Sequence, residues 1–227
     1  MRAFFVPKTE KFGKTIFIEI DNKGRCFKVS DHYYTYQPGS KSDQKTFAFK
    51  LRGNDLKFTS DAGVFSKNEV DFGSRVLIEA FEFPEVEGNI LDVGCGYGPI
   101  GLSIAKDKKD TLVEMVDVNE RALELAKLNA SINQIENVNI HRSDMYETVE
   151  GKYAAILTNP PIRAGKKVVH TILKDSYEKL LPGGELWVVI QKKQGAPSAL
   201  ELLQETFAEV EVVEKKKGYY IIKSKKD

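Results

Sequence analysis

The sequence predicts an α/β protein with a doubly wound, mainly parallel seven-stranded sheet, an antiparallel last strand and N-terminal β-hairpins. The main observation is that short apolar runs alternate with runs of helical spacing from residue 89 onward. Such alternation is typical of right-handed βαβ units around a parallel sheet. The connection at residues 215–218 is too short for a crossover, so the last two strands are expected to form an antiparallel hairpin.

The first 82 residues are expected to form two hairpins and a helix. Residues 14–29 hold a β-rich run, turn chemistry at 21–24 and a returning run, and residues 46–60 repeat this arrangement around Gly53. Residues 31–45 are polar and contain Pro38-Gly39, which is typical of a linker, and residues 69–82 have helical spacing. We therefore expect a hairpin appendage at 1–30 and a main domain at 31–227.

The main domain follows a regular order of strands and helices. Strands are expected at 90–93, 112–117, 138–141, 153–157, 185–190, 208–213 and 219–222, and helices at 100–106, 120–133, 167–181 and 199–207.

Composition excludes several classes of protein. The 227 residues are 41% hydrophobic and 30% charged, an ordinary globular balance that excludes disordered, collagen-like and disulfide-stapled chains. The formal charge of +1 gives no global sign of a nucleic-acid partner. Two distant cysteines and three histidines show no zinc spacing, so no metal is expected. Without an apolar run of secretory or membrane length, a cytoplasmic protein with no membrane partner is expected; the oligomeric state is not indicated.

A glycine-rich loop is the strongest motif. Gly94, Gly96 and Gly98 follow an apolar strand and open a helix, where bare backbone lets a ligand approach closely. The spacing GxGxG departs from the dinucleotide fingerprint. Asp117 ends the next strand, where its carboxylate could accept both ribose hydroxyls, and Asp144 follows the third strand, where it could meet an adenine amino group. The alternative is local structure: a tight turn, with the two aspartates as helix N-caps.

The second motif, Thr158-Asn159-Pro160-Pro161-Ile162, directly follows the fourth strand. Two prolines stiffen the segment and hold the Asn159 amide and the Pro160 carbonyl in place. Two oxygen acceptors suit the two hydrogens of a planar NH2 group. An Asn159→Asp change would keep an acceptor and is expected to be milder than Asn159→Ala. The alternative is a rigid turn with Asn159 as a cap.

These motifs carry a resemblance to a known family. The segment 92–101 resembles motif I of class I S-adenosylmethionine-dependent methyltransferases, and 158–162 resembles the Asn-Pro-Pro-aromatic motif of those that methylate amino or amide nitrogen. With residues 63–66, 71–74 and 159–167, the set resembles the short, single-domain RsmC-like 16S ribosomal RNA guanine-N2 methyltransferases. The resemblance covers residues 31–227 and implies a Rossmann-like methyltransferase domain there.

The resemblance implies methyl transfer from S-adenosyl-L-methionine to an exocyclic amino nitrogen, guanine N2 of small-subunit ribosomal RNA, with that RNA or the small ribosomal subunit as partner. It implies catalytic roles for Asn159 and Pro160. The implied cofactor-binding residues are Asp92, Gly94, Cys95, Gly96, Gly98, Asp117, Asn119, Ser143, Asp144 and Asn159. The implied substrate-binding residues are Pro161, Ile162, Arg163, Lys166 and Lys167. Ile162 stands where many amino-methyltransferases carry Phe or Tyr.

Other functions share part of this chemistry. An amino-methyltransferase acting on DNA adenine or on a protein glutamine amide would use the same motif, and a non-catalytic RNA-binding module would keep the fold. Arg163, Lys166 and Lys167 could hold RNA phosphates or form a solvated face. The lysines at 215–217, 223, 225 and 226 are interpreted as a solvated basic tail.

Overall fold

The computed structural model describes residues 42–227 except 63, 65, 67 and 68, and the backbone of short strands before residue 29. The chain divides into two compact units, Met1–His32 and Tyr33–Asp227. In the first unit, β3 (Ile18–Ile20) pairs antiparallel with β4 (Cys26–Lys28), as the hairpin expected over 14–29 requires. The pair β1 (Lys8–Thr9) and β2 (Thr15–Ile16) was not predicted. Most of the expected linker lies outside the described residues, and the domain boundary stays a prediction.

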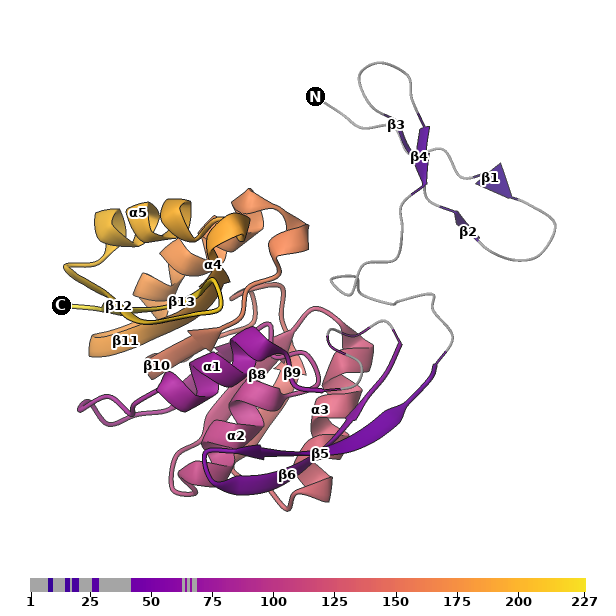
Figure 1. Ribbon diagram of the computed structural model, residues 1–227, viewed down its shortest axis with the longest axis horizontal. Helices are drawn as coiled ribbons and strands as arrows, with labels where there is room; N and C mark the ends of the chain where they lie inside the picture. The colour runs from indigo at the N-terminus through magenta and orange to yellow at the C-terminus, as the bar shows by residue number, and fades with distance from the viewer. Residues whose placement is uncertain are drawn as a thin grey trace. The chain divides into compact units, whose positions relative to one another are not determined.

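The second unit is built on a seven-stranded sheet with the order β12-β13-β11-β10-β7-β8-β9 (Figure 1). The strands from β9 to β11 are parallel, whereas β13 is antiparallel to both of its neighbours. This confirms the predicted doubly wound sheet with its antiparallel last strand. The strands are β7 (Ile90–Val93), β8 (Val113–Asp117), β9 (Val138–Arg142), β10 (Tyr153–Thr158), β11 (Leu180–Gln191), β12 (Glu209–Lys216) and β13 (Tyr219–Lys225).

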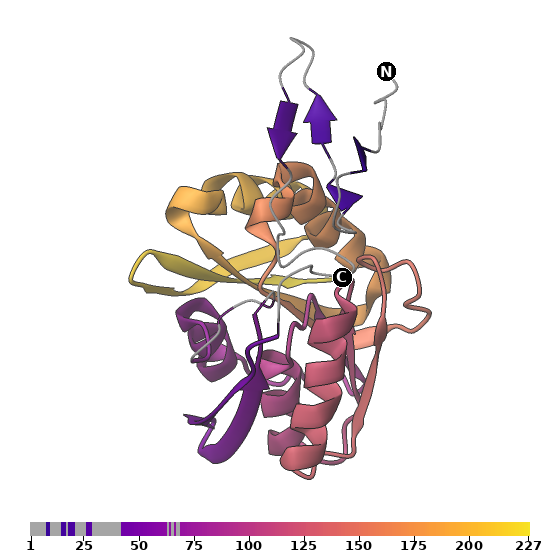
Figure 2. The same ribbon diagram turned by 90° about the vertical axis from the view of Figure 1, so that its right-hand side faces the viewer.

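Helices cover both faces of the sheet because successive strand residues point to opposite sides. Ile90 packs into the apolar cluster shared with α1 to α3, and Leu91 into the cluster shared with α4 and α5. Figure 2 shows the orange and gold helices on one side of the sheet and the purple to pink helices on the other. None of the described helices is long and apolar enough to cross a membrane. The helices are α1 (Phe72–Ala80), α2 (Pro99–Asp107), α3 (Glu120–Ile132), α4 (Lys166–Lys179) and α5 (Ala196–Thr206).

The largest difference from the predicted boundaries lies between α4 and β11. The helix expected to reach residue 181 ends at Lys179, and β11 begins at Leu180, five residues earlier than predicted. Leu180 has φ −85° and ψ 146°, which is extended backbone. Leu181 precedes Pro182, whose ring disfavours helical backbone in the residue before it, so the helix stops there.

A β-hairpin packs beside α3 and confirms the second predicted hairpin: β5 (Lys45–Leu51) with β6 (Asn54–Ser60). Asn129 of α3 accepts from the Thr59 N–H at 2.7 Å and donates to the Thr59 carbonyl at 3.0 Å. Asn133 does the same for Lys57, at 2.8 and 2.7 Å. The two amides thus mimic a neighbouring strand. Asn129 also donates to the Tyr97 carbonyl at 2.9 Å, which anchors the glycine loop to α3.

Candidate functional site

The glycine loop presents bare backbone to open space at the end of β7. Gly94 and Gly96 have φ of +75° and +57°, and a side chain built on either would meet no atom within 4 Å. The Gly94 and Cys95 N–H groups donate to the Val116 carbonyl, which ties the loop to β8. Gly98, at φ +99°, precedes α2, where an added Cβ would lie 2.8 Å from the Leu102 side chain. Gly94 and Gly96 thus allow a ligand to lie directly on the loop, whereas Gly98 allows the close packing of Leu102.

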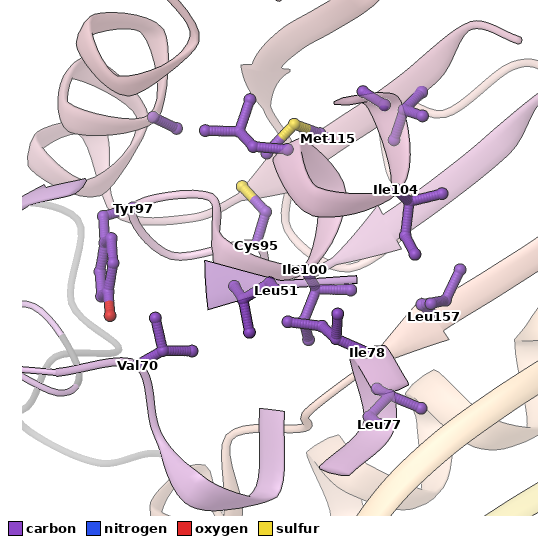
Figure 3. Close-up of a cluster of buried hydrophobic side chains, with 14 of the residues drawn as sticks. Leu51, Val70, Leu77, Ile78, Cys95, Tyr97, Ile100, Ile104, Met115 and Leu157 are labelled. Carbon is purple, nitrogen blue, oxygen red and sulfur yellow. The ribbon is translucent and has the colours of Figure 1, made fainter. Parts of the chain in front are cut away.

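Beside this loop is an open cavity, whose empty space together with the solvent at its mouth amounts to about 540 Å³. Cys95 lines it, but its side chain belongs to the buried apolar cluster drawn in Figure 3, together with Met115 and Ile100. Burial raises the pKa of the Cys95 thiol, so it fits the turn as a small apolar residue. The lining residues are Val64, Ser66, Asp71, Ser74, Gly94, Cys95, Gly96, Tyr97, Pro99, Ile100, Asp117, Asn119, Ala122 and Asn159.

Asp92 is fully buried beneath the loop. Its Oδ2 accepts from the Gly101 N–H at 2.8 Å, whereas its Oδ1 has no hydrogen-bond partner within the described part of the chain. Desolvation raises the pKa of Asp92 to about 7, opposed by the Gly101 bond. A buried carboxyl with an unused acceptor oxygen is costly to keep. Asp92 does not line the cavity beside the loop, so its contact with a ligand stays a prediction.

Asp117 joins the glycine loop to the start of α3. One carboxylate oxygen accepts from the Gly96 N–H and the other from the Asn119 N–H, both at 2.9 Å. The Val118 N–H also bonds this carboxylate, which still keeps acceptor capacity for a ligand hydroxyl. Desolvation raises the pKa of Asp117. The reading of Asp117 as a helix cap is wrong, because the N-cap of α3 is Asn119, whose side chain accepts from the Ala122 N–H at 3.3 Å.

A second, smaller hollow shares Gly94 and Asp117 with the main cavity. Ser143 is buried in its wall and accepts from the Thr148 N–H at 3.1 Å. Asp144 is exposed and lines neither of these two cavities, and it caps none of the described helices. The structure thus brings Ser143 to the site, and contact between Asp144 and a ligand stays a prediction.

Asn159 lines the main cavity, and its amide is held in one orientation. Its Nδ2 donates to Asp71 Oδ2 at 3.1 Å and to Ser74 Oγ at 2.9 Å. Because a carboxylate only accepts hydrogen bonds, the side of the amide facing Asp71 must be the NH2 group. The Asn159 Oδ1 therefore faces away from Asp71, and it has no hydrogen bond to any described residue.

This geometry corrects two expectations. Asn159 caps none of the described helices, since α1 is capped by Asp71, which accepts from the Ser74 N–H at 3.0 Å. An Asn159→Asp change would place two carboxylates in contact, so the structure argues against the mild effect expected from sequence. In the sequence, Asp71 and Ser74 belong only to the segment 71–74 of the family resemblance. Their Asp-x-x-Ser spacing, which is typical of a helix N-cap, is the signal that singles them out.

The residues after Asn159 divide into buried and exposed groups. Pro160 and Pro161 are buried, and Pro161 lines the second hollow. Ile162 begins the short helix η1 (Ile162–Ala164) and packs against the apolar cluster of α4 and α5. The basic residues expected to bind substrate are all exposed, on η1 and the first turn of α4: Arg163, Lys166 and Lys167.

The sheet order, the glycine loop, the acid at the end of β8 and the Asn-Pro-Pro segment at one cavity define a class I methyltransferase. The chain belongs to the methyltransferase small domain family, whose family model matches residues 55–223.

Three known proteins illustrate the relationship. The Bacillus subtilis (strain 168) protein YbxB is 64% identical over 200 residues, which are 87% of this chain and 100% of that protein. Ribosomal RNA small subunit methyltransferase C of Vibrio cholerae is 30% identical over 186 residues, covering 80% of this chain and 53% of that protein. The structure of the T. thermophilus 16S rRNA N2 G1207 methyltransferase RsmC, in complex with AdoMet and guanosine, matches with a TM-score of 0.72 and 26% identity, over 84% of this chain and 52% of that one. The chain thus spans about half the length of these ribosomal RNA methyltransferases.

Proposed function

We propose that this chain transfers a methyl group from S-adenosyl-L-methionine to N2 of a guanine in small-subunit ribosomal RNA. The observation that carries the proposal is the fixed amide of Asn159, which lines the cavity with its NH2 group bound to Asp71 and Ser74 and its oxygen unused. The similarity to small-subunit ribosomal RNA methyltransferases supports this choice of substrate.

The cavity fits the proposed cofactor. Bare backbone at Gly94 and Gly96 leaves room for a ligand, and the Asp117 carboxylate offers acceptors for ribose hydroxyls. When bound, the cofactor supplies a methyl group already activated by its sulfonium, so the protein has mainly to align the acceptor. The residues that would hold it are Asp92, Gly94, Cys95, Gly96, Gly98, Asp117, Asn119, Ser143, Asp144 and Asn159.

The Asn-Pro-Pro segment would hold the target amine. The Asn159 Oδ1 and the Pro160 carbonyl can accept the two N2–H groups of guanine, which favours a tetrahedral nitrogen and the positive charge that develops on it. Asp71 and Ser74 prevent the Asn159 amide from turning its NH2 group toward the amine, which would place donor against donor. A proton held against Oδ1 can pass to water after transfer, so no strong base is needed before attack.

The substrate test is methyl transfer from labelled cofactor to isolated small ribosomal subunits, naked 16S ribosomal RNA, duplex DNA and a release factor. We expect label on the small-subunit RNA, recovered as N2-methylguanosine after digestion to nucleosides. Label confined to DNA, or to glutamine of the release factor, would overturn the proposed substrate while keeping the chemistry of the Asn-Pro-Pro segment. Cofactor binding without transfer to any of the four would leave a non-catalytic module as the better explanation.

The residue test uses Asn159→Ala, with the exposed Asn139→Ala as a matched control. We expect single-turnover methylation by Asn159→Ala to fall by on the order of a hundredfold, the scale for loss of one preorganised electrostatic group. Its affinity for S-adenosylhomocysteine should fall far less than its turnover, because Asn159 is one of ten residues proposed to hold the cofactor, and Asn139→Ala should match wild type in both measurements. Near-normal turnover by Asn159→Ala would remove this amide from the proposed mechanism.

A further inference from the structure

Five exposed lysines lie at the carboxyl edge of the sheet, beside the proposed methyl-transfer site. Two belong to the short helix η2 (Lys192–Gln194) after β11, and three to the end of β12 and the turn before β13. We name them the basic edge: Lys192, Lys193, Lys215, Lys216 and Lys217.

Sheet register places the basic edge near Asn159. Thr158, the residue before Asn159, pairs with Val188 of β11, which continues three residues further to Gln191. Three strand residues span about 10 Å, and β13 lies two strand spacings, again about 10 Å, from β10. Gln191 pairs with Tyr219, and the Lys192 N–H donates to the Gly218 carbonyl at 2.8 Å. The turn and η2 thus lie side by side at this edge, about 10 Å from Asn159 along the strands and about 10 Å across them.

The turn also contacts the helix that orients Asn159. The Lys217 ammonium lies 4.9 Å from the centre of the Phe72 ring, and the Phe72 and Tyr219 rings are 5.6 Å apart. Gly73 permits this approach, because a Cβ there would lie 2.8 Å from the Tyr219 ring. Since Phe72 directly follows Asp71, the lysine turn is packed on the same helix start that binds the Asn159 amide.

The backbone at the tip of the turn favours a different residue. Lys217 has φ +46° and Gly218 has φ +81°, so both central residues are left-handed, as in the type I′ turns that favour Asn-Gly. A lysine adopts this conformation at an energetic cost that asparagine largely avoids. A strained residue beside a functional site suggests that its side chain is needed there.

Two of the other C-terminal lysines, Lys223 and Lys226, contact other elements of the domain, so the expected solvated tail is not a single unit. Lys223 pairs with Glu211 at 3.3 Å and lies over the Trp187 ring. Lys226 donates to the carbonyls of Tyr177 and Leu180, toward the opposite end of β11. Within the basic edge, Lys216 approaches Glu214 at 3.6 Å, and Lys215 lies over the Tyr220 ring. Both lysines are exposed, so their charges remain available.

We infer that the basic edge binds the phosphates of the RNA strand that flanks the target guanine, a role that rests on the proposed function. A row of exposed cations next to the site is complementary to a polyanion. The partly exposed Phe72 and Tyr219 rings, which lie against each other beside these lysines, offer surfaces on which an RNA base can stack. Arg163, Lys166 and Lys167 would contact the strand near Asn159 itself. The two basic groups would then hold the RNA on both sides of the methylated base.

The test measures binding of small-subunit ribosomal RNA transcript in the presence of S-adenosylhomocysteine, across a range of salt concentrations, without turnover. One variant neutralises Lys215, Lys216 and Lys217 to glutamine. A control neutralises three lysines near the amino-terminal ends of β8 and β10, at the opposite edge of the sheet: Lys108, Lys109 and Lys152.

For the turn variant we expect the dissociation constant for RNA to rise at least tenfold near 100 mM salt. The slope of log affinity against log salt should become shallower by about 2, because each of the three lost phosphate contacts contributes about 0.7. The control should keep the wild-type slope, and both should keep wild-type affinity for S-adenosylhomocysteine. If the turn variant and the control share one slope, the inference is wrong. If the wild-type protein methylates only DNA or protein, the proposed RNA substrate is wrong. The salt dependence of DNA binding, measured for the same three proteins, then decides whether the basic edge binds phosphates.

Lys217→Asn separates a binding role from a structural one. Asparagine suits the positive φ, so we expect an unchanged or raised melting temperature together with an RNA dissociation constant raised about threefold. A role in packing alone predicts a lower melting temperature with unchanged RNA binding, and that result would overturn the inference for this residue.

Discussion

Replacing Asn159 by aspartate is the sharpest test of the site geometry. The wild-type NH2 group donates to Asp71 Oδ2 at 3.1 Å and to Ser74 Oγ at 2.9 Å. Asn159→Asp keeps the size of the side chain but turns a donor into an acceptor, so a carboxylate faces the Asp71 carboxylate. If residue 159 only had to present an acceptor to the substrate, this change would have a mild effect on turnover. Because residue 159 also contacts Asp71, we expect a severe loss of stability and of turnover.

The expected cost follows from Coulomb's law. Two unit charges about 3 Å apart repel by about 1 kcal/mol in bulk water and by about 5 kcal/mol at the effective dielectric constant of partly buried sites. The side chains are part-buried, so we expect a destabilisation of roughly 1–4 kcal/mol when both carboxyls are ionised. For a protein of this size, that lowers the melting temperature by roughly 3–12 °C.

Melting curves and single-turnover methylation from pH 5 to pH 8.5 provide the assay. The repelling pair retains a proton to higher pH in the folded state than in the unfolded state. Its stability is therefore preserved at low pH and lost as pH rises. The melting deficit of Asn159→Asp should grow with pH, and turnover at pH 8 should be no better than that of Asn159→Ala. The deficit of Asn159→Ala should vary little with pH.

The double variant Asp71→Asn with Asn159→Asp is the matched rescue. It restores one carboxylate facing one amide. Because Asp71 Oδ2 accepts from both the Asn159 amide and the Ser74 N–H, an NH2 group at that position gives up the hydrogen bond that caps α1, so the recovery is expected to be partial. Melting should return toward wild type at pH 8. A pH-independent deficit for Asn159→Asp, or no rescue by the exchange, would refute the contact between Asp71 and Asn159 as the reason for the orientation of the amide.

Three further predictions concern the remaining groups. Without ligand, Asp92→Asn should melt above wild type at pH 8, and the difference in melting temperature should vanish near pH 4. The reason is that the Asp92 pKa is raised to about 7, so ionising this carboxyl lowers the stability of the wild-type protein by up to about 4 kcal/mol as pH rises. A difference that does not change with pH would contradict this. Asp117→Ala should weaken S-adenosylhomocysteine binding by roughly 1–3 kcal/mol in calorimetry; unchanged affinity would place the ribose elsewhere. Neutralising Arg163, Lys166 and Lys167 together should raise the Michaelis constant for RNA and flatten its salt dependence; a wild-type slope would indicate a solvated face.

Local pattern was sufficient for the sheet and the loops at its edge. The βα alternation after residue 89 predicted the strands within a few residues, apart from the early start of β11 at Leu180. Glycine spacing predicted a loop of bare backbone, and the two prolines predicted a stiff segment after β10. These features depend on backbone conformation and on apolar periodicity, both of which a short stretch of sequence encodes directly.

The partners of the functional side chains depend on contacts between distant residues. Asp71 and Asn159 are 88 residues apart, and Asn129 pairs with the backbone of Thr59 across 70 residues. The spacing of the C-terminal lysines likewise did not separate Lys217 from Lys226.

The sequence by itself therefore determined the fold class and the residue types at the carboxyl edge of the sheet. Only the tertiary structure decided which way the Asn159 amide faces, that Asn119 rather than Asp117 caps α3, and which lysines lie exposed at the carboxyl edge of the sheet. The physical reason is that a hydrogen bond or an ion pair requires a partner at a distance of about 3–4 Å. Packing of whole helices and strands sets that distance, and no local periodicity encodes it.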